Sequence, residues 1–227
     1  MTSGTDPLAS PIQSAELRRD IAGATDAHAR LVESVSGLSD DDLRKGSLLP
    51  GWTIGHVLAH VARNADSHVR MLDAGERGDV VDQYDGGAAG RQAEIERGAL
   101  ADAAWLIADL RRANRSLEQR WSTMSAAGWA GEGRSLMGQV PLSDLPFRRW
   151  RETEVHHVDL DLAYVAESWP GAYVRLELTR LEQQWAARRP MGLTRLPDEA
   201  LAAPPAHRLA WLLGRREIEG LGPAGIF

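Results

Sequence analysis

Apolar residues recur at three- and four-residue steps over several long stretches of this 227-residue chain, the pattern of amphipathic helices. The stretches cover about residues 10–35, 53–75, 91–122 and 142–166. Alternating patterns typical of strands are few, and there is no internal repeat. The sequence therefore predicts a mainly α protein built on an up-and-down four-helix bundle.

Two glycine-containing segments separate these stretches. The loop at 78–90 has no apolar periodicity, so we expect it to be mobile or to flank an opening. The segment at 128–138 is expected to hold short extended pieces.

The character of the chain changes after Trp169-Pro170-Gly171, where a turn resembling a linker is followed by shorter elements. Helices are expected at about 172–188 and 206–215, with a connection and a tail that contain proline and glycine. The sequence therefore predicts a helical domain at 1–168 and a small C-terminal domain at 169–227.

Composition and charge exclude several classes of protein. The net charge of −6 provides no basic face for phosphates, which argues against nucleic-acid binding. The chain has no cysteine, so any metal must be held by nitrogen and oxygen. The first eleven residues are polar and carry no signal or membrane-spanning pattern, which predicts a cytoplasmic protein without a membrane partner. Monomer and homodimer are both compatible with the sequence.

A carboxylate and an imidazole share one face of the fourth predicted helix. Glu152 and His156 are four residues apart, so their side chains can reach a single point. Such a pair needs a third donor to hold a divalent metal, and His60 of the second predicted helix is the best candidate. Three protein ligands leave one position of a tetrahedral ion open, as in catalytic zinc sites.

Each of these residues also has an ordinary explanation. His60 fits a buried, hydrogen-bonded imidazole, and Glu152 with His156 fits a surface pair worth a few tenths of a kcal/mol. From spacing alone we favour this explanation, because such pairs are common in helices. His68, two turns beyond His60, is an alternative ligand.

Neighbouring polar residues are candidates for supporting roles or for plain packing. Asn64 and Asp159 are placed to orient ligand imidazoles, although solvated polar residues are an equal alternative. His157 points about a quarter turn from His156, so a packing role is favoured for it. Glu154 also faces away from the ligand pair, which argues against a role as the base of a metallohydrolase.

Two segments together carry a family resemblance. Gly-Trp-Thr-Ile-Gly-His-Val-Leu-Ala-His-Val-Ala-Arg-Asn-Ala at 51–65, followed by Arg-Glu-Thr-Glu-Val-His-His-Val-Asp-Leu at 151–160, resembles the mycothiol-dependent maleylpyruvate isomerase family. The resemblance implies a DinB-like metal-binding four-helix bundle joined to a small C-terminal α/β domain. It also implies that the metal ligands are His60, Glu152 and His156.

The same resemblance implies an activity. The family's members convert maleylpyruvate to fumarylpyruvate in the gentisate pathway of aromatic catabolism, with mycothiol as a thiol cosubstrate activated by Zn²⁺ or another divalent metal. Asn64 is expected near the cofactor. Gly214-Arg215 is similar to the family's C-terminal Gly-Arg element, so Arg215 is expected to contribute to catalysis and cofactor binding. Without the resemblance, Arg215 reads as a surface arginine at a helix end, and Arg149 is a weaker second cation for a carboxylate substrate.

Two other functions stay open at this point. A mycothiol S-transferase would use the same metal and thiol but keep the adduct. A non-catalytic, stress-associated helical protein would retain the constellation without its chemistry.

Overall fold

The structure, a computed structural model, describes residues 14–188 and 194–225. The predicted first helix began at about residue 10, and its part before residue 14 lies outside the described residues. In chain order the elements are α1 (Ala15–Val35), α2 (Asp40–Leu43), α3 (Ile54–Glu76), α4 (Gly87–Ala99), α5 (Ala103–Thr123), α6 (Ala126–Trp129), β1 (Glu132–Ser135), β2 (Gly138–Pro141), the 3-10 turn η1 (Leu142–Asp144), α7 (Leu145–Asp159), the 3-10 turn η2 (Ala166–Ser168), α8 (Gly171–Ala186), α9 (Asp198–Ala202) and α10 (Pro205–Leu212).

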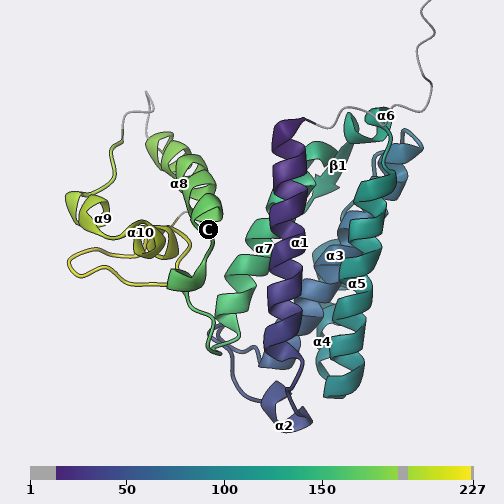
Figure 1. Ribbon diagram of the computed structural model, residues 1–227, viewed down its shortest axis with the longest axis horizontal. Coiled ribbons are helices and arrows are strands. Elements are labelled where there is room, and N and C mark those ends of the chain that lie inside the picture. The colour runs from purple at the N-terminus through teal and green to yellow at the C-terminus, as the bar shows by residue number, and fades with distance from the viewer. Residues whose placement is uncertain (1–13, 189–193, 226–227) are drawn as a thin grey trace, which may run out of the picture. The chain divides into compact units, whose positions relative to one another are not determined.

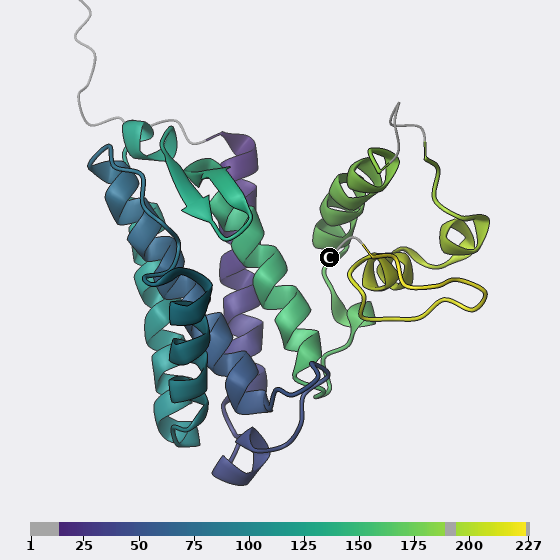
Figure 2. The ribbon, with the colours of Figure 1, turned by 180° about the vertical axis from the view of Figure 1, so that it is seen from behind.

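The long helices α1, α3, α5 and α7 lie side by side as a bundle, which confirms the predicted fold class (Figure 1). Helix α3 is its central element, because it packs against both α5 and α4. Seen from behind, α4 lies in front of α3, against which it packs (Figure 2).

Helix α3 shows how the sequence produces such an element. Thr53 precedes it in extended conformation, and its hydroxyl accepts from the backbone N–H of His56 while the His56 side chain accepts from the backbone N–H of Thr53. The apolar stripe is fully buried, with Val57 and Leu58 both 0% exposed. A rigid, buried helix thus carries His60.

Arg149 of α7 ties the bundle together from within. Its guanidinium is 0% exposed and donates to His28 of α1, to Asn64 and the carbonyl of Val61 in α3, and to Asn114 of α5, at distances of 2.8–2.9 Å. The hypothesis that Arg149 binds a substrate carboxylate is therefore wrong. Its donors are committed to the four-helix core.

Two predicted helices have different ends. The expected helix at 91–122 is two helices, because Asp102 interrupts it and caps α5 by accepting from the backbone N–H of Trp105 at 2.7 Å. The helix expected to reach residue 166 ends at Asp159, and Asp161 adopts a left-handed φ of 55°.

The segment after α6 forms the short extended pieces that its glycines predicted. Strands β1 and β2 pair antiparallel, with Glu132 opposite Pro141 and Ser135 opposite Gly138. Gly138 has a φ of 117°, which a side chain would strain, and it closes the hairpin turn at Leu136 and Met137. The hairpin places these two apolar residues at its tip.

Internal contacts divide the chain into residues 1–156 and 157–227. In the second unit α8 packs against α10, and the rings of Trp185 and Trp211 lie 5.3 Å apart. Within its described residues this unit contains helices, 3-10 turns and loops, whereas the described two-stranded sheet belongs to the first unit. The boundary after residue 168 stays a prediction. Among the described helices, none combines the length and the apolar character needed to cross a bilayer.

Candidate metal centre

The structure brings together the three residues that the sequence analysis proposed as ligands. His60 comes from the buried face of α3, and Glu152 and His156 come from successive turns of α7. Nε2 of His60 lies 2.6 Å from Oε1 of Glu152 and 3.1 Å from Nε2 of His156. The third side, between His156 Nε2 and Glu152 Oε1, measures 3.6 Å.

These separations fit one small cation. Bonds of about 2.0–2.1 Å at tetrahedral angles put the ligand atoms of zinc about 3.3 Å apart. The three measured distances bracket that value. Two imidazoles and one carboxylate are also a donor set that zinc and related divalent metals accept. In the described part of the chain, His60, Glu152 and His156 are the one group of histidine and acidic residues whose ligand atoms lie close enough together to hold an ion.

The protonation states of the group suit metal binding. Burial lowers the pKa of His60 to about 4, and the charges of His156 and Arg91 add to this against the opposing effect of Glu152. For Glu152, burial alone would raise the pKa, but the charges and hydrogen bonds of His60 and His156 hold that pKa well below its usual value. At neutral pH the centre therefore presents a neutral imidazole at His60 and a carboxylate at Glu152.

The ring of His60 is fixed by its surroundings. Nη2 of Arg91 on α4 lies 3.0 Å from its Nδ1, while Nε2 faces Glu152. Trp52 contacts the ring edge-on with centroids 5.5 Å apart. The guanidinium of Arg91 in turn lies over the rings of Trp52 and Tyr84. His60 is 2% exposed, so its orientation is set by packing as well as by hydrogen bonds.

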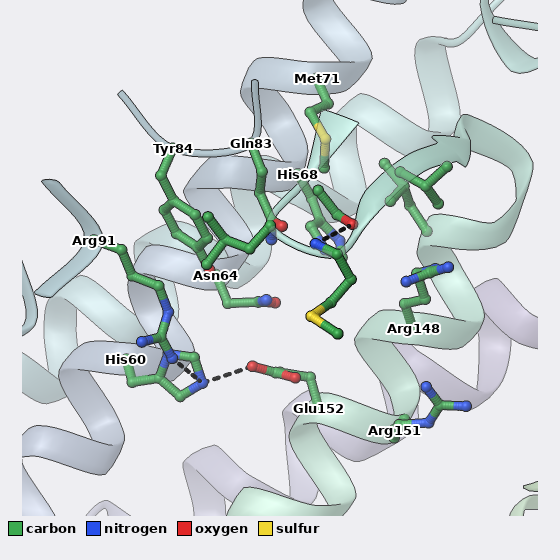
Figure 3. A pocket seen from close by; sticks show the side chains of 15 residues that line it. His60, Asn64, His68, Met71, Gln83, Tyr84, Arg91, Arg148, Arg151 and Glu152 are labelled. Carbon is green, nitrogen blue, oxygen red and sulfur yellow. Dashed lines mark hydrogen bonds and ion pairs between the residues drawn. The ribbon is translucent and has the colours of Figure 1, made fainter. Parts of the chain in front are cut away.

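The group opens into a pocket of about 270 Å³ lined by α3, α4, α7, the hairpin and the loop before α4 (Figure 3). In this view Glu152 points across from α7 toward His60 on α3. Gln83 and Tyr84 come from the loop that was expected to flank an opening, and the pocket confirms that expectation. A ligand held at the ion would enter this space.

Asn64 and His68 line the same pocket, one and two turns beyond His60. Asn64 is 5% exposed and its Oδ1 accepts from Arg149 at 2.9 Å, which fixes its side chain. Its expected role near the cofactor stays a prediction. His68 is outside the group that could share an ion. Burial, followed by the charge of Arg149, lowers the pKa of His68 to about 3, so its imidazole is neutral.

Arg215 forms a two-pronged ion pair in the C-terminal unit. Its Nε and Nη2 donate to the two carboxylate oxygens of Asp159 at 3.1 and 2.9 Å. Gly214 precedes it with a φ of 72°, a conformation that favours glycine. Asp159 was expected to support the ligand imidazoles, and the structure gives it Arg215 as a partner. The catalytic role of Arg215 stays a prediction.

Two further residues behave as their positions suggested. The ring of His157 stacks on Tyr164 with centroids 3.7 Å apart, in agreement with a packing role. The carboxylate of Glu154 accepts from Arg30 and from Trp150 Nε1, so it is engaged away from the ligand pair.

Neither Arg91 nor the tip of the hairpin was expected to line the pocket. Arg91 reaches His60 because α4 folds back along α3 after the segment 77–86. Asp102, a good N-cap residue inside the expected continuous helix, marks the separate start of α5. The glycines around the hairpin indicated a break but not what it would face.

Comparisons with known proteins show which solved structures share this fold. The chain is similar to a solved structure described as the mycothiol-dependent maleylpyruvate isomerase, with a TM-score of 0.76 and 24% identity over 88% of this chain and 89% of that one. A mutant of a mycothiol-dependent maleylpyruvate isomerase matches with a TM-score of 0.76 and 23% identity, over the same shares of the two chains. At these identities the likeness shows a shared fold. A comparison with curated proteins returns no match.

A family model gives the assignment that the fold alone does not. Residues 24–161 match the mycothiol maleylpyruvate isomerase N-terminal domain, and this range includes His60, Glu152 and His156. Because the match covers more than half of the chain, the resemblance seen in the sequence is confirmed, and the protein belongs to the mycothiol maleylpyruvate isomerase family.

Proposed function

We propose that this protein is a mycothiol-dependent cis–trans isomerase that converts maleylpyruvate to fumarylpyruvate at the His60, Glu152 and His156 centre. The observation that carries the proposal is the convergence of these three donors beside a pocket, in a chain whose family is named for that enzyme. Cytoplasmic location and a small-molecule substrate with a low-molecular-weight thiol are parts of the same proposal.

The residues present fit a divalent ion, and zinc is the proposed metal. When bound, it would supply the positive charge that keeps the thiol of mycothiol deprotonated at neutral pH. Glu152 would supply the negative charge of the ligand set, and His60 and His156 would supply imidazole nitrogen donors. Three protein donors would leave the ion able to take the thiol sulfur as well.

Isomerisation then needs no oxidant and no net proton. The sulfur electron pair forms a carbon–sulfur bond at the cis double bond, and the displaced pair moves to the conjugated carbonyl oxygen as an enolate. The former double bond is now single and can rotate. Return of the electron pair expels the same thiolate and restores the double bond in the trans geometry.

A cation is needed for the substrate's carboxylates, and we propose that Arg215 contributes one. A planar guanidinium pairs with a carboxylate through two bonds, the geometry that Arg215 already makes with Asp159. The support for this role is the family's Gly-Arg element, matched here by Gly214 and Arg215.

The first experiment is metal analysis followed by a thiol-dependent assay. We expect His60→Ala and Glu152→Gln to lose the bound metal and to lower kcat/KM for maleylpyruvate by at least about a thousandfold, since the nucleophile is no longer activated. His207→Ala is the matched control, because this histidine pairs with Glu167 in the other unit.

The same assay separates the alternative functions. Retention of stoichiometric metal in either ligand variant would rule out the proposed ligand set. Consumption of mycothiol with a stable adduct would identify an S-transferase, and wild-type protein without metal would favour a non-catalytic role.

A further inference from the structure

The pocket beside the metal centre carries more positive charge than the protein as a whole. Its lining includes Arg91, Arg148 and Arg151, and one acidic residue, Glu152, which belongs to the proposed ligand set. The whole chain has a net charge of −6. A local excess of arginine in an acidic protein favours an anionic ligand at this position.

The positive charge indicates which of the two reactants, the thiol or the electrophile, occupies the pocket. The body of mycothiol is a neutral disaccharide-like group, and its thiol is directed to the ion. An electrophile with a carboxylate is the reactant that gains from the arginines, which bind carboxylates strongly. This step rests on the proposed function, because it assumes that a thiol and an electrophile meet at the centre.

His68 gives the pocket a buried polar group that the protein leaves without a partner. The residue is 3% exposed and lines the pocket, and among the described residues its Nδ1 has no hydrogen-bond partner. The charge of the neighbouring Arg148 contributes to keeping its imidazole neutral. A buried polar atom of this kind is costly unless a ligand or water satisfies it, so the position fits a polar group of a bound molecule.

The opposite wall of the pocket is apolar and exposed. Leu136 and Met137, at the tip of the hairpin, both line the pocket, yet they are 49% and 94% exposed. Met71 of α3 and Val140 of β2 continue this wall inward, and each is almost fully buried. Exposed apolar side chains beside a binding site are typical of a surface that covers an apolar ligand.

We propose that this pocket is the electrophile site and that it selects a carboxylate-bearing electrophile with an apolar body. Arg148 on α7 binds the carboxylate, and the hairpin residues Leu136 and Met137 cover the apolar part. Figure 3 shows Arg148 on the same helix as Glu152, and both line the pocket together with the α3 residues His60, Asn64 and His68. The substrates of the protein therefore extend beyond small, wholly polar dicarboxylates.

The test is the binding of unreactive keto acids to the metal-loaded protein, measured by calorimetry. Benzoylpropionate carries a carboxylate and a phenyl ring, levulinate replaces the ring with a methyl group, and methyl benzoylpropionate lacks the charge. We expect benzoylpropionate to bind roughly tenfold more tightly than levulinate, from burial of the ring. We expect the ester to bind at least about tenfold more weakly than the acid, from loss of the charged hydrogen bond.

Variants assign these preferences to residues. Arg148→Gln should weaken the acid about tenfold and leave the ester unchanged, and Arg44→Gln, an exposed arginine paired with Asp41, is the control. The double variant Leu136→Ser with Met137→Ser should remove most of the preference for the ring. Its control is Leu100→Ser, because Leu100 is 88% exposed and does not line this pocket.

Equal binding of benzoylpropionate and levulinate, or hairpin variants that keep the full preference, would overturn the proposal. Turnover separates this failure from failure of the proposed function. If the binding pattern holds but neither maleylpyruvate nor cis-benzoylacrylate is isomerised, the pocket assignment stands and the isomerase assignment fails. If maleylpyruvate is isomerised while the ring gives no advantage in binding, the isomerase assignment stands and the pocket assignment fails.

Discussion

Arg215 forms an ion pair with Asp159 and is also the residue proposed to bind a substrate carboxylate, so a substitution of it would affect both stability and activity. The side chain of Asp159 is 1% exposed and that of Arg215 is 21% exposed. A buried carboxylate that loses its cation costs about 3–5 kcal/mol, more than the pair contributes over apolar replacements. A loss of activity in an Arg215 variant is therefore not by itself proof of a catalytic role.

A double-mutant cycle separates the two roles. We expect Arg215→Ala to lower the free energy of unfolding by about 3 kcal/mol, and to leave the metal bound, since Arg215 is not a proposed ligand. In Asp159→Ala with Arg215→Ala much of that stability should return. Denaturant unfolding and metal analysis measure both effects. If the double variant regains stability but not kcat/KM, Arg215 acts on the substrate, whereas recovery of both would make it a structural residue.

Among single residues, the sequence predicted the proposed metal ligands but not the arginines that lie near them. Glu152 and His156 could be paired because the helical repeat alone sets their spacing. Arg91 could not be placed beside His60, because that contact depends on how α4 packs against α3, a tertiary feature. Arg149 shared a polar stripe with Glu152 in the sequence, and periodicity could not reveal that three other helices would enclose it.

At the scale of the elements, Arg149 gives the bundle a polar cross-link in place of apolar packing. Its four hydrogen bonds reach α1, α3 and α5 from α7, the helix that also carries Glu152 and His156. Such a network fixes the rotation and register of α7, because a displaced helix would leave buried donors and acceptors unsatisfied. The distances within the metal centre therefore depend on Arg149, although it is not part of that centre.

We expect Arg149→Met to destabilise the protein by about 3–5 kcal/mol, because His28, Asn64, Asn114 and the Val61 carbonyl lose a common donor. Chemical denaturation followed by circular dichroism measures this change. We also expect weaker metal binding in the folded variant, because α7 is no longer held in place. Arg44→Met, at an exposed position, is the control, and an Arg149 variant with unchanged stability and metal affinity would contradict this account.

The element boundaries show what local sequence signals could and could not predict. The first, second and fourth long stretches became α1, α3 and α7, and the third became α4 and α5, because amphipathic periodicity determines which face is buried. The break between α4 and α5 was missed, although Asp102 is a strong N-cap, because apolar residues continue at helical spacing on both sides. The early end of α7 depends on the left-handed turn at Asp161, which the residue type permits but does not require.

At the scale of the whole molecule, buried histidines make stability depend on pH. Burial lowers the pKa of His28 and of His60 to about 4 and that of His68 to about 3, against an ordinary value of 6.5. Between about pH 6.5 and pH 4 the unfolded chain binds protons at these positions and the folded protein does not. The contribution of these histidines to the free energy of unfolding is therefore complete above about pH 6.5. It is lost as the pH decreases through this range.

We expect the metal-free protein to lose on the order of 3 kcal/mol of stability per buried histidine between pH 7 and pH 4. Urea unfolding at a series of pH values measures the slope. In His68→Gln the slope should correspond to about one proton fewer, while His207→Gln, on the exterior of the other unit, serves as the control. A slope unaffected by the His68 substitution would contradict the assignment of a neutral, buried imidazole.

The hairpin tip has a consequence for how such proteins diversify. Leu136 and Met137 are anchored by a two-residue turn and contribute little to the core, so mutations there cost the fold almost nothing. The donors on α3 and α7, by contrast, are embedded in the most constrained part of the bundle. Under the proposed pocket assignment, a few substitutions at the hairpin tip would change which molecules are accepted, while the donors on α3 and α7 stay the same.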